Sequence, residues 1–434
     1  MTELIRDGDS RGQPGSGGTR TLPLWAGRSF ALIAVVLLAL NLRTAVAALS
    51  PIVRLIDHDI PLDSAGLGLI GMLPPVAFAA SALLAPMFAK RLGLERFVVI
   101  AVCAAVLGHL FRALSGSFAA LFASTLLVFI GMGIGNVLLP PLVKRYFPDR
   151  IGVVTSLYAT VMAVGMAAPA LVAFPLADEL GWRLSLGVWS GLALLSLLPW
   201  IGIMLRSRAS RAVVTDEEPV IIEPSVVFAR HVWHSRTAWL IAVIFGVVSF
   251  HVYTMFAWLP EMLIDTAAQT PLAAGALLAL YSAIGFPLAI VVPMLAVRLN
   301  NVSLLIYAGC TTLVLGYLGL ILMPAAAPWL WVALIRLGSL MFPLCLVLIN
   351  LRSRTPHGSA VLSGFVQGIG YTLAAIGPLL VGLLHGLLGG WLGSYLVLLS
   401  TVLAAIVAGI LLRKPAYIED ELAGSTRASS AALW

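Results

Sequence analysis

Residues 29–49 read SFALIAVVLLALNLRTAVAAL, an apolar run that contains a single charged residue, Arg43. A helix of about 20 apolar residues spans the hydrocarbon core of a bilayer. A guanidinium cannot lose its charge, and placing one at the membrane centre costs roughly 2.5–3.5 kcal/mol. Residues 329–350, WLWVALIRLGSLMFPLCLVLIN, form a second such run that contains Arg336. Neither run holds a carboxylate, so the two cations indicate that an anion comes from elsewhere.

The composition of the whole chain is that of a polytopic membrane protein. Of its 434 residues, 60% are hydrophobic and only 10% are charged, and the mean hydropathy is +1.03. Soluble domains carry far more charge. The net charge of +7 follows from the placement of basic residues in loops and does not indicate a nucleic-acid partner. The three cysteines fall in apolar runs without metal or disulfide spacing, so we expect no metal and no cofactor.

Windows of about 20 apolar residues predict an all-α membrane protein with twelve transmembrane helices. The predicted spans are 29–55, 65–89, 96–115, 118–143, 152–176, 184–205, 237–260, 272–297, 303–323, 329–350, 360–386 and 392–412. The polar interruption 206–236, a predicted cytoplasmic linker, separates an N-terminal six-helix half (29–205) from a C-terminal six-helix half (237–412). We expect a disordered cytoplasmic tail at 1–28 and another cytoplasmic tail at 413–434.

Lysine and arginine are concentrated in alternate loops, and this bias sets the predicted orientation. Most of the 26 basic residues fall in the two tails, the central linker and the loops on the same side of the membrane. Arg54, Arg112 and Arg183 lie near the other ends of the helices, where we expect Arg112 to be interfacial. The bias predicts a multi-pass protein of the cell inner membrane with both termini in the cytoplasm.

Landmarks in the first half recur in the second half at nearly constant separation. The pairs are Pro86 with Pro293, Pro148 with Pro356, and Trp182 with Trp391. Such a repeat predicts two parallel six-helix halves, an arrangement that resembles the major facilitator fold. The resemblance implies that the first, fourth, seventh and tenth helices surround a central cavity. Arg43 and Arg336 would then lie on cavity-lining helices of opposite halves.

Four short motifs occur in the first, fourth, seventh and eleventh predicted helices. They are Asn41-Leu42-Arg43 with Pro51, Gly131-Met132-Gly133-Ile134-Gly135-Asn136 with Pro140, Trp258-Leu259-Pro260, and residues 362–371 (LSGFVQGIGY) with Gly377-Pro378. Together they resemble the cyanate/2-nitroimidazole transporter family of the major facilitator superfamily, over residues 29–412. The resemblance implies a secondary active or facilitative transporter of a cyanate-like anion or nitroimidazole-like compound, working by alternating access.

The loop after the second predicted helix departs from the pattern of that superfamily. The usual pattern resembles Gly-x-x-x-Asp-Arg-x-Gly-Arg-Arg, whereas residues 89–96 read AKRLGLER. Lys90 stands where the aspartate belongs, so a charge latch built on that aspartate is not expected. Glu95 is the candidate substitute.

Besides Arg43 and Arg336, six residues within the spans are candidate substrate-binding residues. They are Thr44, Asn136, His251, Trp258, Gln367 and Tyr371. Hydrogen bonding between helices is an alternative role for Asn136, His251 and Gln367. The same alternative holds for Tyr371, which shares a helix face with Gln367. Trp258 either closes the outer mouth of the cavity or belongs to an interfacial tryptophan belt.

All 19 acidic residues lie in predicted tails, loops or span ends, so no buried carboxylate relay is expected. If protons are coupled to transport, His251, Glu261 or the substrate itself carries them. The alternative function is a broad-specificity drug efflux transporter of the same fold. No catalytic constellation occurs at useful spacing, so the chain is not expected to be an enzyme. Its expected partners are a small solute and the lipid bilayer, and we expect a monomer.

Overall fold

The computed structural model describes residues 28–210, 232–299, 301–413 and 416–421, and these contain helices and no strands. The first half comprises α1 (Ser29–Asn41), α2 (Thr44–Ala48), η1 (Ser50–Ile52), α3 (Val53–Asp57), α4 (Ser64–Leu92), α5 (Leu94–Ala113), α6 (Phe118–Tyr146), α7 (Ile151–Leu180) and α8 (Trp182–Ser210). The second half comprises η2 (Val232–His234), α10 (Arg236–Ala267), α11 (Pro271–Arg298), α12 (Ser303–Leu322), α13 (Pro328–Gly338), α14 (Met341–Leu351), α15 (Pro356–Leu388) and α16 (Leu392–Leu411).

Within these residues, 12 helical segments are long and apolar enough to cross a membrane. Their bounds agree with the twelve predicted spans to within four residues, except that the seventh extends seven residues further, to Ala267. The first span is divided into α1, α2, η1 and α3, and the tenth is divided into α13 and α14. The twelve-helix prediction is therefore confirmed. The predicted tails at 1–28 and 413–434 and the predicted linker at 206–236 fall largely outside the described residues.

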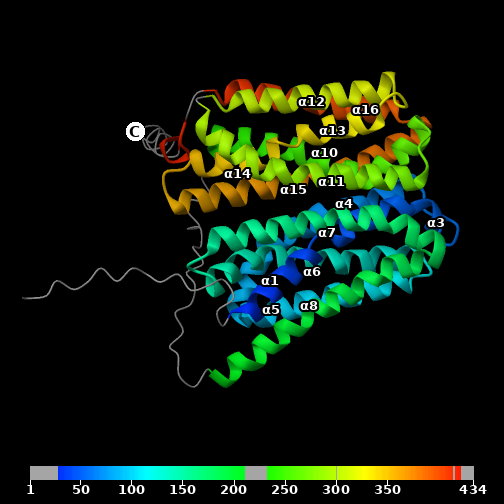
Figure 1. Cartoon of the computed structure of the whole chain (residues 1–434). Helices are drawn as coiled ribbons and strands as arrows, with labels where there is room; N and C mark the ends of the chain where they lie inside the picture. Colours follow the sequence, from blue (N-terminus) through cyan, green and yellow to red (C-terminus); the bar gives the residue numbers. More distant parts are fainter. Residues whose placement is uncertain (1–27, 211–231, 300, 414–415, 422–434) are drawn as a thin grey trace, which may run out of the picture.

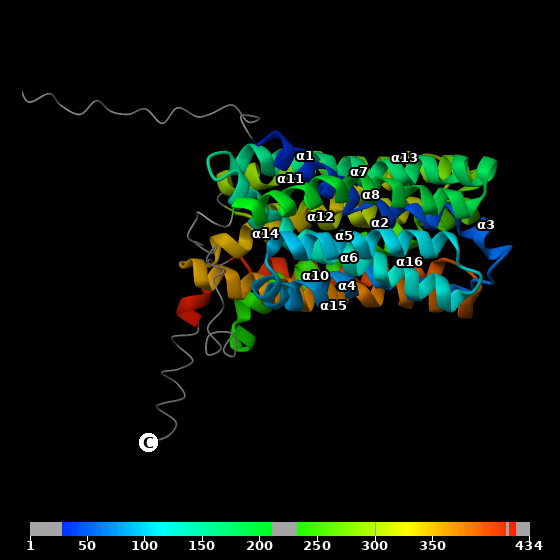
Figure 2. The same ribbon diagram turned by 90° about the horizontal axis from the view of Figure 1, so that it is seen from below.

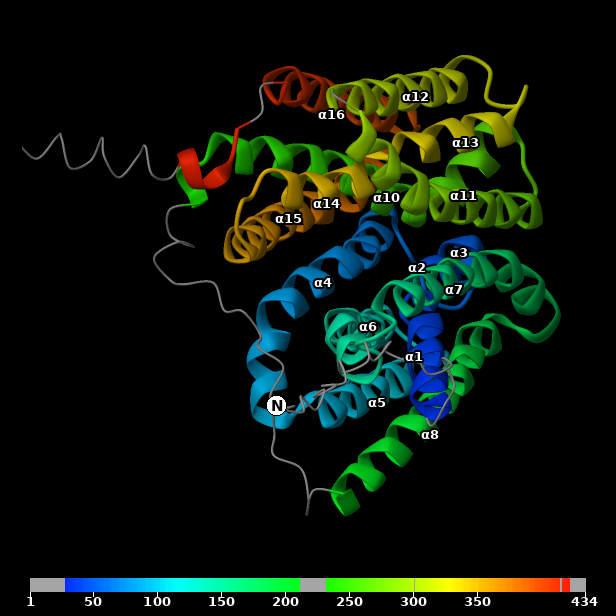
Figure 3. The same cartoon turned by 60° about the vertical axis from the view of Figure 1, so that its left-hand side comes forward.

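The helices form two bundles that lie side by side (Figures 1 and 3). In the first bundle α5 packs on α6 and α8, and in the second bundle α10 packs on α15 and α16. The most extensive contacts between the bundles are those of α4 with α15 and of α7 with α11. The two predicted six-helix halves are thus present as two packed units.

The sequence repeat corresponds to matching hydrogen bonds in the two halves. Trp182 Nε1 donates to Asp59 and Trp391 Nε1 donates to Asp265, both at 2.9 Å. Ser185 donates to the Ala173 carbonyl at 2.8 Å, and Ser394 donates to the Val381 carbonyl at 3.2 Å. Equivalent positions therefore tie the same loops and helices together in each half.

The two ends of the helical bundle differ in character. The basic end carries Arg28, Arg145 and Arg354, and the opposite end carries Arg54 and Arg183. In Figure 2, α14 marks the basic end and α3 marks the opposite end. Arg28 pairs with Asp149 at the basic end, where this guanidinium lowers the pKa of the carboxyl below its usual range.

Acidic side chains from two places in the sequence hold elements together at the basic end. Glu95 is buried, forms an ion pair with Arg145 at 3.2 Å and accepts a hydrogen bond from the Tyr146 hydroxyl at 2.8 Å. It therefore joins the start of α5 to the end of α6, although the loop lacks the usual aspartate. Residues 416–421, which we call the C-terminal clasp, are the second place and contribute Glu419 and Glu421.

The clasp caps two helices of the second half. Glu421 accepts hydrogen bonds from the Thr237 amide at 3.1 Å and from the Ser235 hydroxyl at 2.6 Å, at the start of α10. Glu419 accepts from the Arg354 amide at 2.9 Å and the Thr355 amide at 3.1 Å, at the start of α15. Carboxylates at these positions satisfy unpaired amides and complement the helix dipoles.

Candidate functional site

Arg43 and Arg336 both lie where a membrane-spanning helix is broken. α1 ends at Asn41, and Arg43 occupies the turn before α2 with φ −130° and ψ −5°. Arg336 lies in the last turn of α13, just before the break at Ser339 and Leu340 that separates α13 from α14. The C-terminal end of a helix carries partial negative charge, which offsets part of the cost of burying a cation. The two halves thus place their cations in comparable local structures.

The Arg43 guanidinium lies over an aromatic ring and near one polar side chain. Its central carbon is 5.0 Å from the centroid of the Phe78 ring. Its Nη2 donates to Asn136 Oδ1 at 3.5 Å, a long hydrogen bond. Thr44 is buried and donates to the Asn41 carbonyl at 3.1 Å, so it supports the helix break beside Arg43.

The Arg336 guanidinium is surrounded by aromatic rings. Its central carbon is 4.8 Å from the centroid of Tyr281 and 6.0 Å from that of Phe256. Its Nε is buried without a hydrogen-bond partner among the described residues. A Cβ added to Gly285 would overlap this guanidinium, so the glycine provides the space that the cation occupies.

Both arginines line one cavity of about 560 Å³, the central cavity, which lies between the two halves. Its wall comes from the first, fifth, seventh, eighth and tenth spans and includes Met166, Tyr253, Phe256, Ser282, Phe286, Ser339 and Phe342. The lining continues to Val297 and Leu351, near the ends of α11 and α14. The cavity therefore extends from the two cations toward the basic end.

Close packing between the halves shuts the opposite end. A Cβ added to Gly68 of α4 would lie 2.9 Å from the Pro378 carbonyl oxygen of α15. Arg54 of α3 forms ion pairs with Glu261 at 2.9 Å and with Asp265 at 2.6 Å, both on α10. Helix backbones and charges from both halves thus meet at this end, whereas a Cβ at Gly364 of α15, near the basic end, would meet open space.

Six of the eight predicted substrate-binding residues do not line the central cavity in this structure, and one of them is His251. It is 1% exposed, and its ring nitrogens contact the Tyr317 hydroxyl at 2.7 Å and the Thr401 hydroxyl at 3.0 Å. These partners belong to α12 and α16, on the side of α10 away from the cavity. His251 therefore occupies a helix-packing position, which was its alternative role, because both ring nitrogens already have hydrogen-bond partners.

Trp258 and Glu261 belong to the closed opposite end. The Trp258 indole is 2% exposed and donates to the Pro378 carbonyl at 2.8 Å. Its ring packs at 5.5 Å from that of Trp391. Glu261 pairs with Arg54 across the two halves. Neither side chain reaches the central cavity in this conformation.

Gln367 and Tyr371 lie on α15, behind the cavity wall. The Gln367 amide donates to the Ser363 hydroxyl at 2.7 Å, within the same helix. The Tyr371 ring packs edge-on against Tyr253, a cavity-lining residue, with centroids 6.2 Å apart. Tyr371 can therefore position Tyr253, while neither residue on α15 lines the cavity itself.

The aromatic and small residues that shape the cavity were not among the sequence candidates. Tyr253 and Phe256 come from α10, Tyr281 and Gly285 from α11, and all contribute to the surroundings of the cations. Tyr253 is two residues from His251, so the face of α10 that meets the cavity differs from the predicted one. In the sequence, Gly285 could not be distinguished from the other small residues of α11.

Comparisons with known proteins agree with this architecture. Residues 31–374 match the family model described as Major Facilitator Superfamily. The chain is 35% identical over 367 residues to the uncharacterized transporter YycB of Bacillus subtilis, covering 82% of this chain and 87% of that protein. It is 30% identical over 350 residues to the 2-nitroimidazole transporter of Escherichia coli, covering 80% and 86%. It is also 30% identical over 355 residues to the cyanate transport protein CynX of Escherichia coli, covering 81% and 89%.

Solved structures share the fold. The nucleoside transporter NupG superposes with a TM-score of 0.72 at 11% identity, covering 89% of this chain and 100% of that one. A bacterial homologue of the human lysosomal transporter Spinster, inward-facing and occupied, gives 0.67 at 15% identity, covering 92% and 97%. These identities support the fold alone. The family match and the relatives together show that the chain belongs to the major facilitator superfamily, in the family of the cyanate and 2-nitroimidazole transporters.

Proposed function

We propose that this small-solute transporter carries a cyanate-like anion or a nitroimidazole-like compound by alternating access, with Arg43 and Arg336 binding it in the central cavity. One observation supports the proposal most. The two cations come from opposite halves and line the same cavity, and neither pairs with a carboxylate among the described residues. A solute held by both bridges the halves, so its binding is linked to their relative movement.

The chemistry of the two guanidinium groups suits a planar, electron-rich ligand. Arginine presents a rigid fork of N–H donors that can bind an oxyanion through two parallel hydrogen bonds. Arg336 has an unpartnered Nε, and Arg43 makes one long hydrogen bond, so both retain donors for a ligand. Phe78 and Tyr281 attract the cations through their ring faces without neutralising them.

The size and wall of the cavity narrow the class of solute. A volume of about 560 Å³ far exceeds that of a three-atom anion. Phe256 and Phe342 provide flat apolar surfaces beside the cations. A planar ring that carries a nitro or carboxylate group uses both features, whereas a bare cyanate would share the cavity with water. We therefore favour the nitroimidazole-like part of the class.

We further propose that the basic end faces the cytoplasm, as the positive-inside bias predicts. The cavity is then open to the inside, and Trp258 and Glu261 help to close the outer end. If transport is coupled to protons, Glu261 is better placed than His251. Protonation of Glu261 would break its ion pair with Arg54 and weaken the contact between the halves at that end.

Binding measurements on purified protein separate this function from broad drug efflux. We expect 2-nitroimidazole and sodium cyanate to raise the melting temperature saturably and to compete with each other. Ethidium, a large cation, is expected to have no such effect because two cations line the cavity. Saturable stabilisation by ethidium, with no response to either small solute, would instead support the drug exporter.

A further inference from the structure

A third arginine is buried without a hydrogen-bond partner among the described residues, outside the lining of the proposed substrate site. Arg112 lies in the last turn of α5, at the opposite end, and its exposed fraction is 0%. This corrects the expectation that it is interfacial. Its Nε and both Nη atoms lack hydrogen-bond partners among the described residues. A guanidinium keeps its charge, and a buried charge with no counter-ion costs several kcal/mol.

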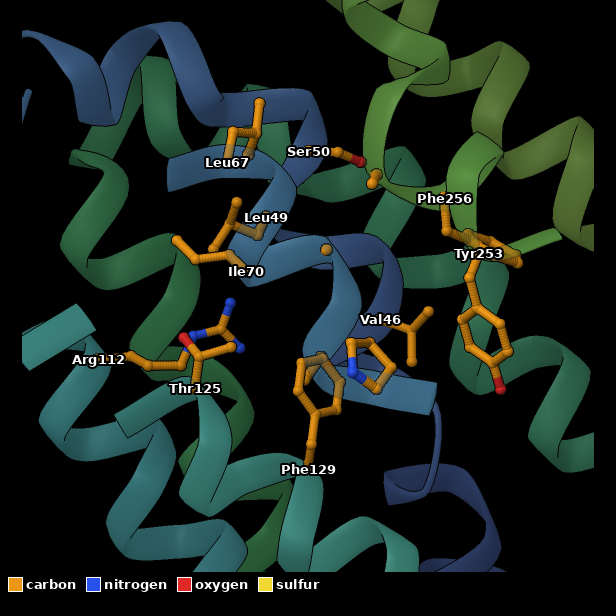
Figure 4. Close-up of a pocket in the computed structure, with 14 residues that line it drawn as sticks. Val46, Leu49, Ser50, Leu67, Ile70, Arg112, Thr125, Phe129, Tyr253 and Phe256 are labelled. Atoms are coloured by element: carbon orange, nitrogen blue, oxygen red, sulfur yellow. The ribbon is translucent and has the colours of Figure 1, made fainter. Parts of the chain in front are cut away.

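The Arg112 side chain points into a small cavity of its own (Figure 4), which we call the Arg112 cavity. Its volume is about 30 Å³, and Thr125 of α6 lies beside the guanidinium while Ile70 and Phe129 form apolar walls. Ser50 of η1 lines the cavity from another side. The hydroxyl groups of Thr125 and Ser50 also lack partners among the described residues. Three groups that can donate hydrogen bonds therefore line one apolar space.

Two acidic groups at this end of the protein, Asp59 and Asp63, are engaged elsewhere. Asp59 accepts hydrogen bonds from Arg183 and Trp182, and these donors lower the pKa of its carboxyl. Asp63 caps the N-terminus of α4. No carboxylate lines the cavity around Arg112. The charge of this arginine thus has no protein counter-ion among the described residues.

We propose that the Arg112 cavity is a second anion site, which holds one small inorganic anion of about the size of chloride. The volume supports this size, because a buried water needs about 10–15 Å³ by a comparable measure. A small anion, alone or with one water, fits within about 30 Å³, whereas an aromatic carboxylate does not. Arg112 supplies the opposite charge, and the Thr125 hydroxyl supplies an additional donor.

This site is separate from the central cavity but adjoins it. Val46, Tyr253 and Phe256 line both spaces, so one layer of side chains divides them. The Arg112 cavity lies on the closed side of that layer, between the central cavity and the opposite end. Its anion has two sources, bulk chloride that remains bound or a transported small anion that passes through, and both need the same chemistry.

The test measures equilibrium binding of radiolabelled chloride to the purified, full-length protein. The starting variant carries both Arg43→Ala and Arg336→Ala, which removes the cations of the proposed substrate site. We expect this variant to bind chloride saturably, with about one ion per chain. Adding Arg112→Gln is expected to weaken binding about tenfold or more, the loss typical of charged hydrogen bonds. Arg91→Gln, at an exposed position of the basic end, is the matched control and should change nothing.

Thr125→Val keeps the shape of the side chain and removes its hydroxyl, so it decides the question if Arg112→Gln fails to fold. We expect it to weaken chloride binding several-fold. Cyanate is expected to displace chloride, and benzoate is not. If cyanate displaces chloride at concentrations below that of chloride, the ligand is the transported anion. If displacement needs cyanate concentrations above that of chloride, the ligand is resident chloride.

Two results would overturn the second site. One is the absence of saturable chloride binding in the starting variant. The other is binding that survives unchanged in Thr125→Val and in any folded Arg112→Gln protein. If the proposed substrate site is wrong, the pattern is different. Wild type and the starting variant then each bind the same single chloride.

Discussion

Replacing Arg336 with alanine removes the cation of the second half from the central cavity and leaves the surrounding rings in place. The guanidinium forms no ion pair among the described residues, so its removal leaves no carboxylate unpaired. We therefore expect the Arg336→Ala protein to fold and insert normally. Any loss of solute binding can then be assigned to the missing donors rather than to a damaged structure.

The expected size of the loss follows from the hydrogen bonds available to a ligand. A hydrogen bond to a charged group contributes about 1.5–3 kcal/mol, and about 1.4 kcal/mol is tenfold in Kd, so we expect about 10- to 140-fold weaker binding. Arg43→Ala is expected to fall in the same range. Arg43→Lys should recover only part of the affinity, because lysine lacks the planar fork.

The double variant tests whether the two arginines bind one ligand. If both contact the same anion, the Arg43→Ala and Arg336→Ala losses are not additive, and the double variant loses little more than the worse single variant. Isothermal titration of the four proteins with 2-nitroimidazole and cyanate, at fixed ionic strength, gives the required affinities. Arg91→Ala controls for the loss of an exposed arginine. Wild-type affinity in a well-folded Arg336→Ala protein, or strict additivity, would refute the reasoning.

Three further perturbations test the surrounding structure. Gly285→Ala puts a methyl group where the Arg336 guanidinium lies and should weaken solute binding nearly as much as Arg336→Ala, while Gly364→Ala has open space and should not. Equal affinities in the two glycine variants would contradict this. Arg54→Ala removes two partly exposed ion pairs between α3 and α10. Because exposed ion pairs are weak, spin-label distances across that end should show the open population rising by at most about fivefold for each pair that is lost. An unchanged distance distribution would argue that these ion pairs do not help to hold that end closed. His251→Gln should lower the melting temperature, because it disturbs two hydrogen bonds of a buried ring worth about 1 kcal/mol each, and leave solute affinity unchanged. Altered affinity at an unchanged melting temperature would return His251 to the site.

The twelve spans and the two halves could be predicted because apolar length and the sequence repeat report directly on membrane crossing. The two cavity arginines could be predicted for a related reason. A cation in the middle of an apolar run is too costly to keep without a role, so Arg43 and Arg336 stood out before any packing was known.

The neighbours of each helix face could not be predicted in the same way. Periodicity places His251 and Trp258 on a shared face, but it does not say that this face turns toward α12, α15 and α16. The sequence contained an indication that Arg112 is buried, but its position near a helix end suggested an interfacial residue instead. Arg112 continues the row of small buried residues Ala101, Ala105 and Gly108, which packs closely against α6.

The C-terminal clasp has a practical consequence for shortened versions of this protein. A chain that stops at Arg413 loses Glu419 and Glu421. The amide of Thr237 in α10, and those of Arg354 and Thr355 just before α15, then lack their carboxylate partners. Each lost cap of this kind typically costs about 0.5–2 kcal/mol. An affinity tag joined after Glu421 keeps both caps. Trimming for crystallisation should therefore spare these six residues, although they lie beyond the last membrane-spanning helix.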